Sequence, residues 1–582
     1  MRDRQRWRLR VTFDLSEVAQ RALESDDTVL VSGGPGSGKT TLSLLKAQSL
    51  VPSLKPGQEI LFLSFSRAAV RQVEIRCKDV LTGDERKLIS VRTYHSFSME
   101  VLRSHGRLLT GNVPSIIYPG PEAIMRAEFS GQWTEETKRL ASDEGRYAFN
   151  EFAAGAARLI EGSDAVASLI ASKYPVVILD EFQDTDDSQW ALVQALSPRS
   201  RLIFLADPDQ RIFDYDPRVD PERLNQLRSS LSPAEFELLG ENHRSPDAGV
   251  LDFANAVLLN KALPVTKDVN LASYWPKAFE STVHAAVIWM FSQLRKEGIH
   301  HPSVAVLART NSLIGRVSGA LSAEHTFNKQ TLRPVDHDVL WDAELTAAAA
   351  MVVASVLEWS SLPRGEAVGR TLARIADYFD TRNANTTGGN KSARDAAVRF
   401  RTAAGQVRTH AEPRPKSAKA LVAAFDEALS PTGLPQRDWI AARERLEHHN
   451  DLSALVGDAR FIRLFRATDE IGGRLTALWD RHGSYRNATD VVKKALEAGK
   501  VQANQREPRG CVLMNMHKAK GKEFDGVVIV EGYRTSVFFD PSREKAPFES
   551  SRRLLRVAIT RARHRVAIVR PAGATALVSP LS

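Results

Sequence analysis

The stretch that decides the fold is Gly33–Thr40, which reads GGPGSGKT. It follows the apolar run Thr28–Ser32 and precedes a helical pattern, Thr41–Leu50. A GxxxxGK[ST] loop in this context is typical of a phosphate-binding loop, because its glycines let backbone N–H groups wrap phosphates and the helix N-terminus adds a positive dipole. The predicted nucleotide-contacting residues are Gly33, Gly34, Pro35, Gly36, Ser37, Gly38, Lys39, Thr40 and Thr41.

Three more apolar runs end in polar motifs, as expected for parallel strands that are covered on both faces. Glu59–Ser64 leads into a helical pattern, Pro175–Leu179 into DEFQDT, and Arg201–Ala206 into DPDQ. Strands that alternate with helices predict a doubly wound α/β domain. Ligands of such domains bind beyond the carboxyl ends of the strands, where all these motifs lie.

A second set of strand-like runs follows late in the chain, at Ser303–Leu307, Gly526–Val530 and Arg565–Val569. We therefore expect two α/β lobes, each interrupted by a mostly helical insertion. The stretch Thr381–Ala420 inside the second insertion is polar and basic. Its pattern leaves two interpretations open, a solvated flexible loop or a surface that contacts nucleic acid.

Asp180 and Glu181 follow the buried run VVIL directly. An acid at the end of such a strand can bind hydrated Mg²⁺, and a second acid beside it can orient or deprotonate an attacking water. With the phosphate-binding loop upstream, this pair predicts a site for ATP hydrolysis. The expected metal ligands are Thr40 and Asp180, and the expected cofactors are ATP and Mg²⁺.

The bulk composition favours a polyanionic partner. The 582 residues carry 79 Lys+Arg against 70 Asp+Glu, a formal charge of +9. Two cysteines without a CxxC pair make a zinc or iron–sulfur site improbable. There is no long apolar run and no apolar stretch after the basic N-terminus, so we expect a cytoplasmic protein without a membrane partner.

The motif DEFQDT (180–185) and seven others, in one order along most of the chain, resemble the UvrD/Rep/PcrA group of superfamily 1A helicases. The seven are GGPGSGKT (33–40), SFSRAAV (64–70), TYHSF (93–97), DPDQRIFDY (207–215), ENHRS (241–245), HKAKGKEFD (517–525) and RVAITRAR (556–563). The resemblance implies two RecA-like P-loop domains, one at 1–96 and 171–240 (1A) and one at 241–360 and 501–582 (2A). It also implies helical insertions at 97–170 (1B) and 361–500 (2B).

The same resemblance implies roles for single residues. The catalytic set is Lys39, Asp180, Glu181, Gln210, Arg244 and Arg561, with both arginines reaching the γ-phosphate from the second lobe. Glu523 would hydrogen-bond the ribose and Gln20 would read the adenine edge. Contacts with single-stranded DNA would come from Phe65, Thr93, His95, Phe213 and Tyr215. One departure from the family is Arg556, which stands where an aromatic residue is frequent.

The expected function is an ATP-dependent 3′–5′ DNA helicase and single-strand DNA translocase that acts in repair or recombination. Its partners would be single-stranded and 3′-tailed duplex DNA, with a nuclease or a repair protein. A short 1B insertion leaves another function open, that of an ATPase and DNA-sensing effector subunit which partners a nuclease in anti-phage defence. Clearance of proteins from DNA without unwinding, and an RNA substrate, also remain open.

Overall fold

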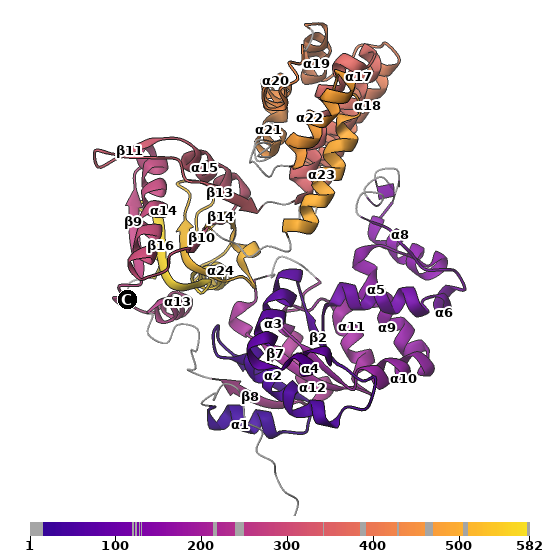
Figure 1. Cartoon of the computed structure of the whole chain (residues 1–582), viewed down its shortest axis with the longest axis vertical. Helices are drawn as coiled ribbons and strands as arrows, with labels where there is room; N and C mark the ends of the chain where they lie inside the picture. The colour runs from indigo at the N-terminus through magenta and orange to yellow at the C-terminus, as the bar shows by residue number, and fades with distance from the viewer. Residues whose placement is uncertain are drawn as a thin grey trace, which may run out of the picture. The chain divides into compact units, whose positions relative to one another are not determined.

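The computed structural model (Figure 1) describes residues 15–118, 122, 125–126, 129, 131–212, 218–238, 249–340, 343–384, 391–427, 430–447, 449–459, 470–503 and 510–578. The chain forms two compact units. The first comprises Met1–Thr282, Ala286–Arg309 and Met516–Ser582, and the second Val283–Ala285 and Thr310–Asn515. Within the described residues, every helix is too short or too polar to cross a bilayer.

The first unit contains a six-stranded sheet in which all neighbouring strands run parallel. Its order is β3-β2-β6-β7-β1-β8. The strands are β1 (Val29–Gly33), β2 (Ile60–Ser64), β3 (Ile89–Thr93), β6 (Val176–Leu179), β7 (Arg201–Ala206) and β8 (Ala234–Leu238). Their carboxyl ends therefore lie at one edge, which brings together the polar motifs that follow β1, β2, β6 and β7.

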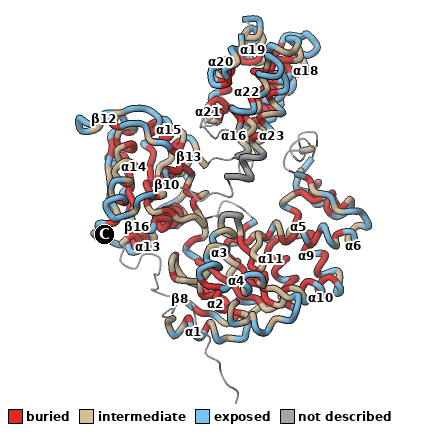
Figure 2. The backbone as a smooth tube through the Cα atoms, viewed as in Figure 1, coloured by how far each residue is buried: buried red, intermediate tan, exposed pale blue. Residues whose placement is uncertain are grey.

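Alternate residues of these strands face two separate cores. Val29 and Val31 of β1 pack with α1 (Glu17–Glu24), α2 (Lys39–Leu50) and α3 (Arg67–Val80). Leu30 faces the opposite core, with α5 (Tyr94–His105), α9 (Phe152–Gly162), α10 (Asp164–Lys173), α11 (Asp187–Leu196) and α12 (Arg223–Leu231). The central strands β2, β6 and β7 of the sheet are almost entirely buried, and Figure 2 colours the interior of this region as buried. Burial on both faces explains why its central strands are continuous apolar runs.

Four more parallel strands of the first unit pair in the order β10-β15-β16-β9. Their bounds are β9 (Val269–Tyr274), β10 (Ser303–Ala308), β15 (Phe524–Val530) and β16 (Ala562–Pro571). The helices α13 (Val250–Leu258), α14 (Phe279–Lys296) and α24 (Glu549–Ile559) accompany them. Together with the first sheet, these strands confirm the predicted α/β fold class with two RecA-like domains.

The described residues of 97–170 are mostly helical. Besides α5, α9 and α10, they form α6 (Arg107–Thr110) and α8 (Trp133–Arg139). A two-stranded parallel pair, β4 (Ser115–Ile116) with β5 (Arg146–Tyr147), joins them. A further short helix, α4 (Gly83–Lys87), precedes β3.

The second unit is dominated by helices. It contains a hairpin, β11 (His325–Phe327) with β12 (Gln330–Leu332), and a parallel pair, β13 (His337–Leu340) with β14 (Gly510–Asn515). Its helices are α15 (Asn311–Ser322), α16 (Ala343–Leu357), α17 (Arg364–Ala384), α18 (Lys391–Arg408), α19 (Lys416–Asp426), α20 (Pro435–Glu447), α21 (Ser453–Ala459), α22 (Glu470–His482) and α23 (Ala488–Ala503).

The flexible-loop interpretation of Thr381–Ala420 is wrong for the described part of that stretch. It forms the end of α17, all of α18 and the start of α19. Ala393, Ala397, Phe400, Ala404 and Val407 of α18 are buried in the core of the second unit. Their spacing of three or four residues puts them on one face of the helix, so the basic residues between them occupy the exposed face.

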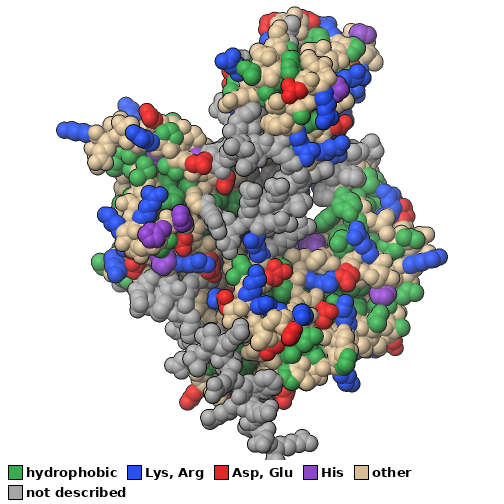
Figure 3. All heavy atoms as spheres, viewed as in Figure 1, with side chains coloured by type: hydrophobic (Ala, Val, Ile, Leu, Met, Phe, Trp, Pro, Cys, Tyr) green, Lys and Arg blue, Asp and Glu red, His purple; other side chains and the backbone are tan. Residues whose placement is uncertain are grey.

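On the face drawn in Figure 3, Lys and Arg side chains lie among acidic ones on every described part of the chain. Charges of both signs are therefore mixed over the described surface of that face. Nucleic-acid contacts must be argued from individual residues and their geometry, because net charge alone does not place them.

Candidate active site

The loop between β1 and α2 has the backbone geometry of a phosphate cradle. Gly36 and Gly38 adopt φ of 81° and 83°, values that residues with a Cβ rarely adopt. A Cβ on Gly33 would lie only 2.6 Å from the Ser37 hydroxyl oxygen. Since Gly38 is the N-cap of α2, the first N–H groups of a 12-residue helix point out of the loop. An anion bound here would receive these donors and the positive end of the helix dipole.

Lys39 extends along this loop. Its ammonium donates to the carbonyl oxygens of Gly33 at 2.6 Å and Gly34 at 2.9 Å. The hydroxyl of Ser37 is buried and has no hydrogen-bond partner among the described residues. Pro35 is buried within the loop, and Thr40 and Thr41 lie half-buried in the first turn of α2. The cradle, the orphaned hydroxyl and the lysine fit the phosphates of a nucleotide.

Asp180 and Glu181 follow β6 at the neighbouring position of the same sheet edge. The backbone N–H of Asp180 donates to Leu63 O at 3.0 Å, and the Ser64 hydroxyl lies 3.5 Å from Asp180 Oδ2. Glu181 has φ of 52°, in the left-handed region that non-glycine residues rarely occupy. This conformation turns its carboxylate toward Gln183, whose amide donates to Glu181 Oε2 at 2.6 Å. Such strain persists only where the surrounding structure enforces it, which is common at active sites.

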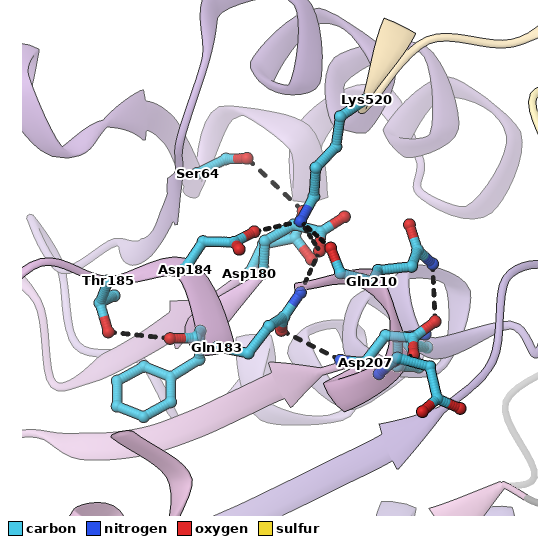
Figure 4. Close-up of polar contacts among 12 residues, drawn as sticks. Ser64, Asp180, Gln183, Asp184, Thr185, Asp207, Gln210 and Lys520 are labelled. Carbon is cyan, nitrogen blue, oxygen red and sulfur yellow. Dashed lines mark hydrogen bonds and ion pairs between the residues drawn. The ribbon is translucent and has the colours of Figure 1, made fainter. Parts of the chain in front are cut away.

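Lys520 connects these acids with the segment that precedes β15. Its ammonium donates to Asp184 Oδ2 and, at 2.7 Å, to the carbonyl oxygen of Gln210, and it lies 3.7 Å from Glu181 Oε2. Figure 4 shows the lysine reaching down onto the residues that follow β6 and β7. Both the Lys520 and Asp184 side chains are buried, at 9% and 1% exposure. A buried ammonium with several acceptors fixes the relative positions of the chain segments that it joins.

A second set of contacts centres on Gln210, at the end of the short turn Pro208–Gln210. Its amide nitrogen donates to Asp207 Oδ2 at 2.6 Å, and its amide oxygen accepts from Arg561 Nη2 at 3.2 Å. The backbone N–H of Asp207 donates to Gln183 Oε1 at 3.0 Å. Arg561 is 3% exposed and comes from the turn between α24 and β16. Gln210 thus links the carboxylate-bearing loop to Arg561.

The environment shifts the pKa values of the adjacent carboxyl groups of Asp180 and Glu181 in opposite directions. Burial, with the neighbouring Glu181 carboxylate, raises the pKa of Asp180. Burial also opposes ionisation of Glu181, but the positive charges of Lys520 and Lys39 outweigh it and lower the pKa of Glu181. Burial raises the pKa of Asp184 despite the adjacent Lys520. Adjacent carboxyls with opposite pKa shifts can serve different chemical roles, and Glu181 is the one held ionised.

The other predicted nucleotide contacts are Glu523, Gln20 and Arg244. Glu523 lies just before β15, where its carboxylate accepts from Arg563 Nε at 3.2 Å. Gln20 is exposed on α1, and its amide donates to Glu24 of the same helix at 3.2 Å. Arg244 lies outside the described residues. The structure therefore brings together Lys39, Asp180, Glu181, Gln210 and Arg561 of the predicted set.

Three of the five predicted DNA contacts, Phe65, Thr93 and His95, lie at or just after the ends of β2 and β3. Ser64 pairs with Thr93 across these strands, so Phe65 and Thr93 lie at neighbouring strand ends. The half-buried ring of Phe65 lies 5.5 Å from that of Tyr94, and Thr93 caps α5 by accepting from the Ser96 N–H at 3.1 Å. His95 is exposed and lines a hollow of about 200 Å³ with Phe149, Asn150 and Arg218. Phe213 and Tyr215 lie outside the described residues.

Sequence reasoning missed Lys520, Asp184, Gln183 and Asp207. All four belong to motifs that it identified, HKAKGKEFD, DEFQDT and DPDQ. The sequence signal that could have found them is a charged or amide residue within a motif that follows or precedes a buried strand. Their partners could not be predicted, because each contact joins segments far apart in sequence, such as Lys520 with Asp184.

Comparison with known proteins gives two family models that match. Residues 16–215 match an AAA domain, and residues 510–569 match the UvrD-like helicase C-terminal domain. These two regions carry the phosphate-binding loop, both carboxylates, Gln210, Lys520 and Arg561.

Individual relatives point the same way. The chain is 22% identical to an ATP-dependent DNA helicase PcrA of Leuconostoc citreum over 356 residues, which are 51% of this chain and 47% of the relative. It is 21% identical to a PcrA of Staphylococcus aureus, over 51% of this chain and 48% of the relative. A RecBCD enzyme subunit RecB of Mycolicibacterium smegmatis is 30% identical over 24% of this chain and 13% of the relative. The match thus spans about half the length of the PcrA relatives and less of RecB.

Proposed function

We propose, from the premise that this chain is a UvrD/PcrA-like protein of helicase superfamily 1, that it hydrolyses ATP to move along single-stranded DNA in the 3′–5′ direction and to separate strands. The observation that carries the proposal is the polar network around Gln210. It joins the acids after β6 to Lys520 and Arg561, which flank the strands of the second sheet. A change at the phosphates would be transmitted through Gln210 to both sheets.

The residues of the site divide the chemistry among them. The backbone N–H groups of Gly36–Thr40 and the Lys39 ammonium would hold the phosphates. Thr40 and Asp180 would hold a Mg²⁺ ion, which supplies charge neutralisation to the phosphates when bound. Glu181, kept ionised by Lys520 and Lys39, would accept the proton of the attacking water. Arg561 and Arg244 would donate to the terminal phosphate and stabilise its transferring charge.

Movement follows when the ligand binds one arrangement of the two lobes more tightly than the other. The amide nitrogen of Gln210, which donates one hydrogen to Asp207, would donate its second hydrogen to the terminal phosphate, because phosphate oxygens only accept. The residues at the ends of β2 and β3, Phe65, Thr93 and His95, would grip the strand. Phe65, Phe213 and Tyr215 supply π-faces that stack on any base, which suits tracking without sequence preference. By this reasoning the protein acts on DNA in repair or recombination, alone or with a partner protein.

The test measures both the direction of movement along single-stranded DNA and the unwinding of duplex DNA. Streptavidin displacement from single strands biotinylated at the 3′ or 5′ end, and unwinding of 3′-tailed, 5′-tailed and blunt duplexes, are measured with ATP. We expect faster displacement of streptavidin from the 5′ end, toward which the protein moves, and unwinding of the 3′-tailed duplex only. Lys39→Ala should abolish both activities, whereas Lys55→Ala, an exposed lysine of the same domain, should not change them. Equal displacement from both ends, or displacement by Lys39→Ala, would refute the proposal.

A further inference from the structure

Arg556 is buried at the first sheet although it belongs to α24. The side chain is 3% exposed. Its Nε donates to Asn255 Oδ1 at 3.1 Å, and its Nη1 and Nη2 lie 3.7 Å from Asp207 Oδ1 and 3.9 Å from Asp209 Oδ2. Strong hydrogen bonds between a guanidinium and a carboxylate measure about 2.7–2.9 Å. The two acids therefore hold the charge of Arg556 loosely and leave its terminal donors unsaturated.

The structure leaves one of these donors without an acceptor. Nη1 of Arg556 is buried and has no hydrogen-bond partner among the described residues. A buried donor left unsatisfied destabilises the fold, and a charged donor does so more than a neutral one. Such a group in a native site calls for an explanation, and an acceptor that binds transiently is one.

The guanidinium faces the phosphate-binding loop. A Cβ placed on Gly34 would lie 3.5 Å from Arg556 Nη2, with ordinary van der Waals contact between them. The carbonyl of Gly34 is also an acceptor for the Lys39 ammonium at 2.9 Å. The fork of Arg556 and the ammonium of Lys39 thus meet at one residue of the loop, from two different segments of the chain.

We propose that Arg556 is a further residue of the nucleotide site, which binds the terminal phosphate of ATP and distinguishes ATP from ADP. The inference rests on the proposed function, because it takes the loop to be an ATP site. A phosphate offers several anionic oxygens to the planar fork of an arginine, and it is a stronger acceptor than carboxylates at 3.7–3.9 Å. An aromatic residue, frequent at this position in the family that the chain resembles, supplies no such donor.

Asp207 connects Arg556 with Gln210 and, through Gln210, with Arg561. One of its oxygens lies near Arg556, and the other accepts from Gln210, which in turn accepts from Arg561. Movement of Arg556 toward a phosphate would withdraw positive charge from Asp207 and strengthen its hold on Gln210. The nucleotide would then be sensed at two points of α24 and the turn that follows it.

The test compares ATP and ADP binding in the full 582-residue chain. Calorimetry is done in a Glu181→Gln background, so that ATP is not consumed, with and without Arg556→Met. We expect Arg556→Met to weaken ATP binding about tenfold, equivalent to about 1.4 kcal/mol, and ADP binding less than about twofold. Equal losses for both nucleotides, or no loss, would overturn the proposal.

Two further variants keep the result interpretable. Arg552→Met is the matched control, since Arg552 is as buried on α24 but donates to the carbonyls of Val257 and Leu577. It should leave the ratio of ATP to ADP affinity unchanged. If Arg556→Met does not fold, Arg556→Lys keeps a buried charge without the fork, and an unchanged ratio in that variant contradicts the assignment. Nucleotide binding without DNA-dependent hydrolysis in the unmutated protein would refute the proposed function and still leave this ratio measurable.

Discussion

Replacing Lys520 by methionine removes the cation that joins the acids after β6 to the segment before β15. The variant keeps the length and most of the volume of the side chain, so the perturbation is one of charge. It leaves Asp184, 1% exposed, without its ammonium partner, and Glu181 without its strongest cationic neighbour.

The distance and burial of the charges around Lys520 determine how much stability the variant should lose. At 3.7 Å, the attraction between Lys520 and Glu181 is about 4.5 kcal/mol with the effective dielectric constant of about 20 that suits such pairs. Desolvation offsets much of this energy, but breaking a buried pair by removing one partner costs about 3–5 kcal/mol. Because burial already raises the pKa of Asp184, that carboxyl can take up a proton and reduce the loss, so we expect the lower end, about 3 kcal/mol.

If the link is needed to assemble the site, about 3 kcal/mol corresponds to roughly a hundredfold slower turnover. Steady-state ATP hydrolysis with saturating single-stranded DNA measures this effect, and thermal unfolding measures stability. The double variant Asp184→Asn/Lys520→Met should regain stability but not turnover, since it removes the unpaired acid without restoring the link. Lys545→Met, at an exposed position, is the control. Turnover and melting temperature in Lys520→Met equal to those of the unmutated protein would refute the reasoning.

Three other predictions concern groups away from the phosphates. Burial, with the charge of Arg309, lowers the pKa of His517 to about 4. The fold therefore has its full stability with respect to this group above pH 6.5, where the imidazole is neutral. The free energy of unfolding decreases as pH falls toward 4, by at most about 3 kcal/mol, because the unfolded chain takes up the proton first. Melting temperatures at pH 7.5 and 5 should differ less in His517→Gln, and an equal difference would contradict this. Burial raises the pKa of Cys77 to about 11, and Cys511 is also buried, so a maleimide at pH 8 should label neither thiol until denaturant is added; rapid labelling of the native protein would disprove it. Lys46→Met should lower the free energy of unfolding by about 2–4 kcal/mol, because its ammonium donates to three carbonyls at the end of α1; denaturant titration checks this, and no change in midpoint would count against it.

The central strands could be predicted from the sequence because a strand that is buried on both faces consists of a continuous run of apolar residues. β2, β6, β7, β10 and β15 appear within a residue or two of the expected positions. The edge strands β3, β8 and β9 were missed, and so were β13 and β14 of the second unit. The residues of β9 are mostly half-buried or exposed, and those of β8 alternate, so neither contains an apolar run.

The candidate site could be predicted as far as local motifs reach. The loop around Lys39 and the acids after β6 follow from spacing, because strand ends of a parallel sheet share one edge. The role of Lys520 could not, because it depends on a contact with Asp184, 336 residues away. The flexible-loop interpretation of Thr381–Ala420, one of the two left open, is wrong for another reason. Small alanines supply much of the buried face of α18, and they give a weaker apolar signal than Leu or Ile.

The most direct test of the central claim is the rate of ATP hydrolysis with and without single-stranded DNA, in the unmutated protein and in Glu181→Gln. We predict strong stimulation by DNA, and a reduction of about 10²–10⁴-fold in the variant, as expected on loss of a general base. Hydrolysis that DNA does not stimulate, or a Glu181→Gln protein that hydrolyses ATP as fast as the unmutated one, would contradict the account.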